Sequence, residues 1–189
     1  MRPTRRDALG ALALAAAMAV LPQAARAAEA AVIDARVELA LERLYGTVPG
    51  SRELARGAEG VLVMPRVVKG GFILGGSYGE GKLLLPDPDG GFLNGGYYSV
   101  AAASIGLQAG VQQTAHALFF LTGEALARFR ASDGWELGAD AEFTVPDTGV
   151  NIGLSSTEFE KPVVAIVFAE DGLLIGASLE GAKYSPISR

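Results

Sequence analysis

Residues 60–86 read GVLVMPRVVKGGFILGGSYGEGKLLLP, and this stretch predicts β structure for the middle of the chain. Short apolar runs alternate with glycines, a pattern typical of strands joined by tight turns. We expect strands over Val61–Val68, Phe72–Tyr78 and Lys82–Leu85, separated by glycine turns. Glycine is enriched throughout, at 25 of 189 residues, against a typical ~7%. Because the glycines follow no triplet period, a turn-rich sheet is a better interpretation than a low-complexity segment.

The strand pattern continues to the end of the chain. The expected elements are a long strand over Tyr97–Leu121, a short helix over Thr122–Arg130, and strands over Leu137–Val145, Val163–Phe168 and Leu173–Leu179. The first of these is so long that it must bend or break into two strands. Thr122 is a suitable N-cap for the short helix. Asp171-Gly172 lies between two apolar runs, which is a typical hairpin signal.

Upstream of the strands, Ala30–Tyr45 is expected to form the one long helix. Its apolar residues recur at helical spacing and make a single stripe, which consists of Ile33, Val37, Ala40, Leu41 and Leu44. A short second helix is expected from Ser51, a good N-cap, to Arg56. The predicted fold class is therefore α+β, with an amphipathic N-terminal helix packed on a glycine-rich antiparallel sheet. Barrel-like closure of that sheet is one option.

The first 27 residues resemble an export signal. Arg2, Arg5 and Arg6 form a basic region, Ala8–Leu21 is apolar, and Ala25-Arg26-Ala27 is an A-x-A cleavage signal. Arg5-Arg6 also fits a twin-arginine motif, so both general and twin-arginine export are open. We expect residues 28–189 to form a single domain in the periplasm, with peripheral contact to a membrane as one option. Without the leader, 12 basic and 20 acidic residues give a net charge of −8, which argues against nucleic-acid partners.

Few catalytic groups are available. The chain has no cysteine and one histidine, His116, so thiol chemistry and multi-histidine metal sites are excluded. Gly75-Gly76-Ser77-Tyr78-Gly79 fits G-x-S-x-G, but that motif acts at a strand-to-helix turn, and an apolar strand follows here. Gly76–Lys82 resembles a phosphate loop but lacks the Ser or Thr that would bind magnesium, so a β-turn is expected. We interpret His116 as a solvated or hydrogen-bonded strand residue, and we expect neither catalysis nor a cofactor.

Positive charge is concentrated in one segment. Residues 52–82 contain five basic and three acidic residues, whereas residues 83–189 contain five basic and 13 acidic ones. If the five basic side chains share a face, they would bind an anionic head group. The candidate ligand-binding residues are Arg52, Arg56, Arg66, Lys69 and Lys82. Asp34, Glu38 and Glu42 line the long helix, and helices that lie on membranes are usually basic, so this helix is not expected to supply the site.

Several ordered segments resemble the SYLF lipid-binding domain family. They are Leu54–Pro65, Val68–Phe72, Gly75–Gly81, Gly106–Gly110 and Gly172–Gly181. The chain departs from the family pattern at Leu93, where a Trp is usual, and at Ala115-His116, which replaces an Asp-containing pair. The resemblance implies a non-enzymatic domain that binds anionic lipids.

The leading hypothesis is therefore an exported protein that binds anionic phospholipid, with a phosphoinositide-like head group, at the bacterial envelope. Its partner would be an anionic lipid or a membrane surface. The alternative is a structural or stress-related envelope protein that acts through protein–protein contacts. An esterase that uses Ser77 and His116 is a distant third hypothesis.

Overall fold

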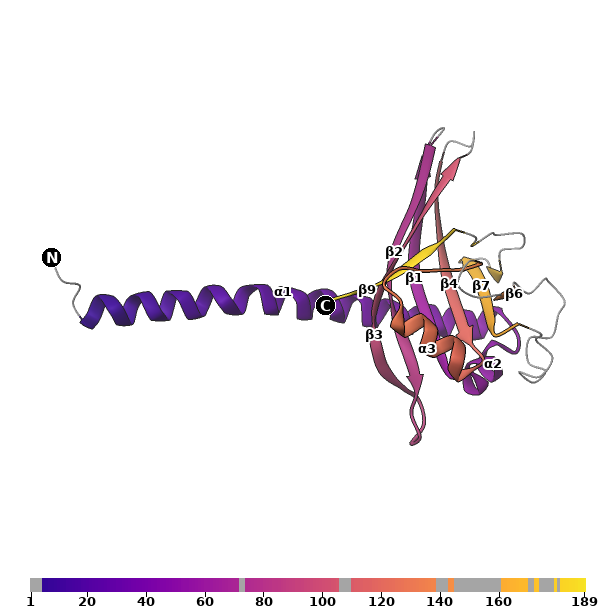
Figure 1. The fold of residues 1–189 in the computed structure, drawn as a ribbon, viewed down its shortest axis with the longest axis horizontal. Helices are drawn as coiled ribbons and strands as arrows, with labels where there is room; N and C mark the ends of the chain where they lie inside the picture. The colour runs from indigo at the N-terminus through magenta and orange to yellow at the C-terminus, as the bar shows by residue number, and fades with distance from the viewer. Residues whose placement is uncertain are drawn as a thin grey trace.

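A long N-terminal helix crosses one face of a sheet (Figure 1), which confirms the α+β class. The computed structural model describes residues 5–71, 74–105, 110–138, 143–144, 161–169, 172–173, 179 and 181–189. Its elements are α1 (Arg5–Thr47), α2 (Ser51–Gly57), β1 (Gly60–Gly71), β2 (Leu74–Pro86), β3 (Phe92–Ile105), β4 (Gly110–Phe120), α3 (Gly123–Ala131), β5 (Trp135–Glu136), β6 (Phe143–Thr144), β7 (Val163–Ala169), β8 (Gly172–Leu173) and β9 (Lys183–Ile187).

The described strands form one sheet that curls strongly. Their order is β5-β9-β3-β2-β1-β4-β7-β6, with β8 beside β7, and only the β6–β7 pair among them is parallel. Five steps separate β5 from β4, a distance of about 24 Å in a flat sheet. Yet the rings of Trp135 on β5 and Phe120 on β4 lie 5.9 Å apart. The sheet therefore curves around a shared interior as a half-barrel.

Apolar residues fill both sides of the central strands. On the convex side, Ile33, Val37 and Leu44 of α1 pack against the sheet in a first core that includes Phe119. On the concave side, Phe129 of α3 packs in a second core with residues of β1, β4, β5, β7 and β9. Because both faces of β1 and β4 are covered, their central residues form continuous apolar runs rather than an alternating pattern.

The helix α1 contains the expected Ala30–Tyr45 segment and extends far beyond the sheet on its N-terminal side (Figure 1). Among its described side chains, which begin at residue 26, Ile33 is the first buried one. The stripe that was expected to contact the sheet does so through Ile33, Val37, Ala40 and Leu44, while Leu41 is partly buried. None of the helices, as far as the structure describes them, combines the length and apolarity needed to cross a membrane.

The expected turn at Gly79–Gly81 is wrong, because β2 is one continuous strand. The two strands predicted over Phe72–Tyr78 and Lys82–Leu85 merge, with residues 72–73 outside the described part. A register shift between Val63 and Arg66 brings the β1 backbone close to β2. A Cβ atom on Gly81 would lie 2.0 Å from the Val63 carbonyl oxygen. These glycines permit close approach of two strands and do not mark a turn.

Ser51 is not the N-cap of α2, in contrast to the prediction. Gly50 takes that position with a φ of 81°, a left-handed conformation that favours glycine. The buried Ser51 hydroxyl lies 2.6 Å from the Val48 carbonyl oxygen and 3.1 Å from that of Leu44. It therefore donates to carbonyl groups at the C-terminal end of α1 and just after it.

Other local predictions are confirmed. The Tyr97–Leu121 segment breaks into β3 and β4. Thr122 caps α3 by accepting a 3.2 Å hydrogen bond from the Ala125 backbone N–H. β7 pairs with β8 on either side of the predicted hairpin turn. Most of the predicted strands over Leu137–Val145 and Leu173–Leu179 lie outside the described residues.

Candidate functional site

The five basic residues expected to bind an anion do not form one group. Arg52 and Arg56 lie on α2, where the Arg52 guanidinium carbon sits 4.3 Å from the centre of the Tyr45 ring. Burial raises the pKa of Tyr45, and the two arginines oppose that rise. This pair is on α2, which follows the C-terminal end of α1 (Figure 1), whereas the other three residues are on β1 and β2.

Lys82 forms a structural ion pair. Its Nζ lies 2.8 Å from Asp34 Oδ1, and the lysine side chain is only 15% exposed. The Tyr97 hydroxyl also donates to Asp34 at 3.1 Å. Burial and this hydrogen bond raise the pKa of Tyr97. The charge of Lys82 is thus neutralised at the contact between α1 and β2.

Arg66 and Lys69 project from opposite faces of β1. The pairing with β2 runs without a break from Arg66–Glu80 to Lys69–Ser77, and side chains three positions apart on a regular strand point to opposite sides. Arg66 is on the convex face with α1, where its Nε donates to Gln113 Oε1 at 2.9 Å. Of these two residues, only Arg66 faces α1.

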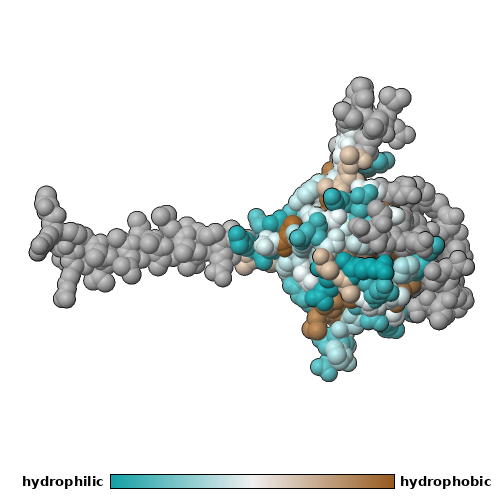
Figure 2. Space-filling model, viewed as in Figure 1, coloured by the Kyte–Doolittle hydropathy of each residue, from teal (hydrophilic) through white to brown (hydrophobic). Residues whose placement is uncertain are grey.

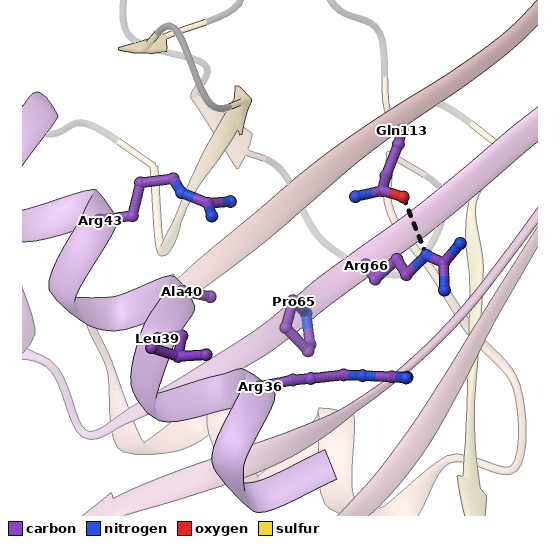
Figure 3. Close-up of a pocket in the computed structure, with 7 residues that line it drawn as sticks. All are labelled: Arg36, Leu39, Ala40, Arg43, Pro65, Arg66 and Gln113. Atoms are coloured by element: carbon purple, nitrogen blue, oxygen red, sulfur yellow. Dashed lines mark hydrogen bonds between the residues drawn. The ribbon is translucent and has the colours of Figure 1, made fainter. Parts of the chain in front are cut away.

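A cavity of about 220 Å³ lies between α1 and the sheet, beside Arg66. It is lined by Arg36, Leu39, Ala40, Arg43, Pro65, Arg66 and Gln113, and we call it the arginine pocket (Figure 3). Three of these seven described residues are arginines and none is acidic. In Figure 3, Arg36 and Arg66 extend toward the same side, and the bond to Gln113 fixes the direction of Arg66. The pocket is therefore suited to an anionic group.

The helix carries its charges on two separate stripes. Successive residues are about 100° apart, so Val32, Arg36, Leu39 and Arg43 fall within about 60° of one another. Asp34, Glu38 and Glu42 lie between about 90° and 170° away from the centre of that stripe. Val32 is 48% exposed and Leu39 is 61% exposed. The acidic residues were the reason not to expect lipid binding by this helix. They lie apart from a second stripe, which is basic and apolar.

Arg36 and Arg43 were missed by the sequence prediction. The signal was present, because two arginines seven residues apart share a helix face with two apolar residues at similar spacing. The same helix also carries three acidic residues, and the segment with a local excess of basic residues begins only at residue 52, so composition alone does not reveal the arginine stripe. Packing of the core stripe on the sheet then places these arginines beside Arg66.

His116 is buried on the concave face, with 6% of its surface exposed. Its Nε2 lies 3.1 Å from the Thr114 hydroxyl, in line with the expectation of a hydrogen-bonded strand residue. Burial lowers the pKa of His116 to about 4. Ser77 lies inside β2, which continues to Pro86, so the strand-to-helix turn of a nucleophile elbow does not occur there.

Comparison with known families was informative for the second half of the chain. Residues 101–188 match the Ysc84 family, described as Las17-binding protein actin regulator. This match supports a Ysc84/SYLF domain over residues 101–188. No curated protein matched the chain. The Ysc84/SYLF family is a non-catalytic binding domain that is linked to lipid binding.

The range that matches the family runs from the middle of β3 to the end of β9. Gln113 of the arginine pocket lies inside that range, whereas all three arginines lie before it. The pocket therefore joins a side chain of the matched region to side chains of α1 and β1. Among the described residues, no group of three His, Asp or Glu side chains is placed to bind a metal ion.

Proposed function

We propose that this chain binds anionic phospholipid head groups through the arginine pocket, as an exported protein at the bacterial envelope. The observation that carries the proposal is that Arg36, Arg43 and Arg66 line one cavity. The link of the family to lipid binding supports it. A cavity of about 220 Å³ is smaller than the ~300–1,000 Å³ pockets that hold drug-sized ligands. It suits a compact head group rather than a whole lipid.

The electrostatics of the pocket favour an anion. Guanidinium groups bind phosphate through paired, charge-assisted hydrogen bonds. The bond from Arg66 Nε to Gln113 leaves the terminal nitrogens of Arg66 available to a ligand. The chain as a whole is negatively charged, so the arginine pocket is a positive site on an acidic protein. Binding of an anion should therefore depend on the positions of these arginines more than on the net charge of the chain.

The side chains around the pocket suit a membrane surface. Val32 and Leu39 are exposed on the same stripe as Arg36 and Arg43. Surface-bound helices combine apolar residues that enter the head-group region with basic residues that contact lipid phosphates. A membrane on this side would meet the basic stripe, while Glu38, about 130° around the helix from its centre, would point away from it.

Export is part of the proposal. The basic region, apolar stretch and Ala25-Arg26-Ala27 signal of the first 27 residues support cleavage near Ala28. Such cleavage would retain the whole buried stripe of α1, which begins at Ile33. The mature protein would then reach lipid from the periplasm, peripheral to a membrane.

Vesicle flotation with two matched double variants tests the site. Arg36→Ala with Arg66→Ala removes two charges from the pocket, and Arg52→Ala with Lys69→Ala removes two exposed charges elsewhere. Each basic residue near an anionic surface contributes about 1 kcal/mol. We expect the pocket variant to bind phosphatidylglycerol-containing vesicles about thirtyfold more weakly, and the control to lose less than about threefold. Vesicles of phosphatidylcholine alone should bind none of the three proteins appreciably, neither the unsubstituted chain nor the two double variants.

Equal losses in the two double variants would show that net charge, and not the arginine pocket, determines binding. Equal binding of the unsubstituted chain to neutral and anionic vesicles would overturn the proposal. The loss should also shrink as salt is added, because exposed charges are screened over about 8 Å at physiological ionic strength.

A protein partner is the second candidate. The family description names a protein-binding role, and Leu93 on the β2–β3 hairpin is 50% exposed. Figure 2 shows hydrophobic surface where this hairpin leaves the body of the sheet. If the hairpin contacts a protein, Leu93→Ser should reduce cross-linking to envelope proteins while vesicle binding is unchanged. Cross-linking that is unaffected by Leu93→Ser would remove this candidate.

A further inference from the structure

Arg66 has an acidic neighbour to which it is not paired. Arg66 on β1 and Glu80 on β2 are directly opposite in the antiparallel register. Side chains opposite each other share a face and have Cβ atoms about 4.5–5.5 Å apart, so opposite charges at such positions normally interact. Within the described residues, however, Arg66 is hydrogen-bonded to Gln113 and forms no ion pair with a carboxylate.

Glu80 is held by other residues. The Arg189 guanidinium pairs with Glu80 Oε1, and the Tyr78 hydroxyl donates to the same oxygen at 2.7 Å. This hydrogen bond raises the pKa of Tyr78. Arg189 also lies 3.6 Å from Glu29 of α1, measured from Nη1 to Oε2. The Arg189 side chain is 22% exposed and that of Glu80 is 26% exposed, so this group is partly shielded from water.

We propose that Arg189 is a positioning residue for the arginine pocket, because it keeps the Glu80 carboxylate away from Arg66. A carboxylate opposite Arg66 would compete with any anionic ligand for the same guanidinium group. By pairing with Glu80, Arg189 leaves Arg66 to Gln113 and to the ligand. The expected effect of Arg189 on lipid binding rests on the proposed function. Its effect on the contact between Arg66 and Glu80 can be measured without lipid.

The first experiment measures the coupling between Arg66 and Glu80 from urea unfolding. A double-mutant cycle with Arg66→Ala and Glu80→Gln is carried out in the unsubstituted chain and again with Arg189→Ala. We expect no measurable coupling while Arg189 is present and favourable coupling once it is removed. Equal coupling in both backgrounds would overturn the inference. If the alanine variant does not fold, Arg189→Gln provides the second background.

The second experiment measures binding to phosphatidylglycerol-containing vesicles. Arg189→Ala should weaken binding about fivefold, which corresponds to the ~1 kcal/mol contribution of one basic side chain at an anionic surface. Glu80→Gln should restore that loss in the Arg189→Ala background, because the competing charge is gone. Arg128→Ala is the matched control, since Arg128 is an exposed arginine on α3 that pairs with Glu124. The control should bind as the unsubstituted chain does.

The outcomes separate this inference from the proposed function. Weak binding of Arg189→Ala that Glu80→Gln does not restore would indicate a purely structural role for Arg189 and would overturn the inference. Binding by Arg189→Ala at the unsubstituted level would do the same while the lipid proposal stands. If the unsubstituted chain shows no preference for anionic vesicles, the proposed function fails, and the unfolding cycle alone decides whether Arg189 keeps Glu80 from Arg66.

Discussion

Lys82 and Asp34 join β2 to α1 through an ion pair of 2.8 Å, and Tyr97 donates a hydrogen bond to the same carboxylate. Two partners therefore depend on one acidic side chain, which is 38% exposed, whereas the lysine is 15% exposed. The contact orients the helix on the sheet. The two sides of the pair should consequently respond differently to substitution.

Asp34→Ala should destabilise the domain more than Lys82→Met. The first change leaves a shielded ammonium group and a tyrosine hydroxyl without their acceptor, at a cost of about 1–3 kcal/mol. The second removes a charge but leaves Asp34 with Tyr97 and solvent, which should cost at most about 1 kcal/mol. Urea denaturation measures both, with the exposed Glu38→Ala on the same helix as a control. The reverse order would show that the lysine stem, and not the charge pair, stabilises this contact.

Substitutions on two sides of α1 should separate folding from binding. Leu44 is fully buried and Leu39 is 61% exposed. Leu44→Ala should lower the free energy of unfolding by about 2–5 kcal/mol through the cavity it leaves. Leu39→Ala should leave stability within about 0.5 kcal/mol and weaken binding to anionic vesicles. Thermal melts and flotation of both variants check this, and unchanged binding of Leu39→Ala would exclude contact between lipid and this stripe.

Acid should destabilise the fold through His116. Burial lowers the pKa of this residue to about 4 in the folded chain, against about 6.5 when unfolded. Between these values the unfolded chain binds more protons than the folded chain. The stability that comes from keeping His116 neutral is therefore fully present above pH 6.5 and is lost as the pH decreases toward 4. The difference corresponds to on the order of 3 kcal/mol. His116→Gln should reduce the slope of stability against pH in this window. An unchanged slope would mean that carboxylates, and not His116, cause the loss of stability in acid.

Two glycines of β2 should differ sharply when replaced by alanine. At Gly81 the added Cβ would meet the Val63 carbonyl oxygen at 2.0 Å, whereas at Gly76 the nearest atom is the Ala102 carbonyl oxygen at 3.6 Å. Gly81→Ala should therefore cost about 3 kcal/mol or more, and Gly76→Ala should be tolerated. Unfolding of the two purified variants measures the difference. A well-tolerated Gly81→Ala would mean that β1 can move away from β2 at its bulge.

Local patterns predicted the elements but not how glycine is used within them. The apolar stripe of α1 and the Thr122 cap follow directly from residue spacing, and both are confirmed. The Gly79–Gly81 segment was misread because glycine marks both turns and close approach of two backbones. Only the pairing of β1 with β2 separates these cases, and that pairing joins residues distant in sequence.

The candidate site was less predictable than the fold. Arg66 was identified from its basic segment, but its neighbours come from α1 and β4. A sequence cannot show that Lys69 turns away from Arg66 until the strand register is fixed, or that Lys82 meets Asp34. Arg36 and Arg43 required the orientation of the helix on the sheet, which the core stripe determines.

The chain has one tryptophan, and it lies in the second core, where the Trp135 ring packs against Phe120, Phe129 and Tyr184. No described residue of the first core is a tryptophan. Intrinsic fluorescence therefore reports the closure of the curled sheet, while circular dichroism at 222 nm is dominated by the helices, of which α1 is the longest. Coincident unfolding curves from the two signals would mean that the helix and the curled interior form one cooperative unit. Separate curves would reveal a state in which the interior is intact and the helix has left the sheet.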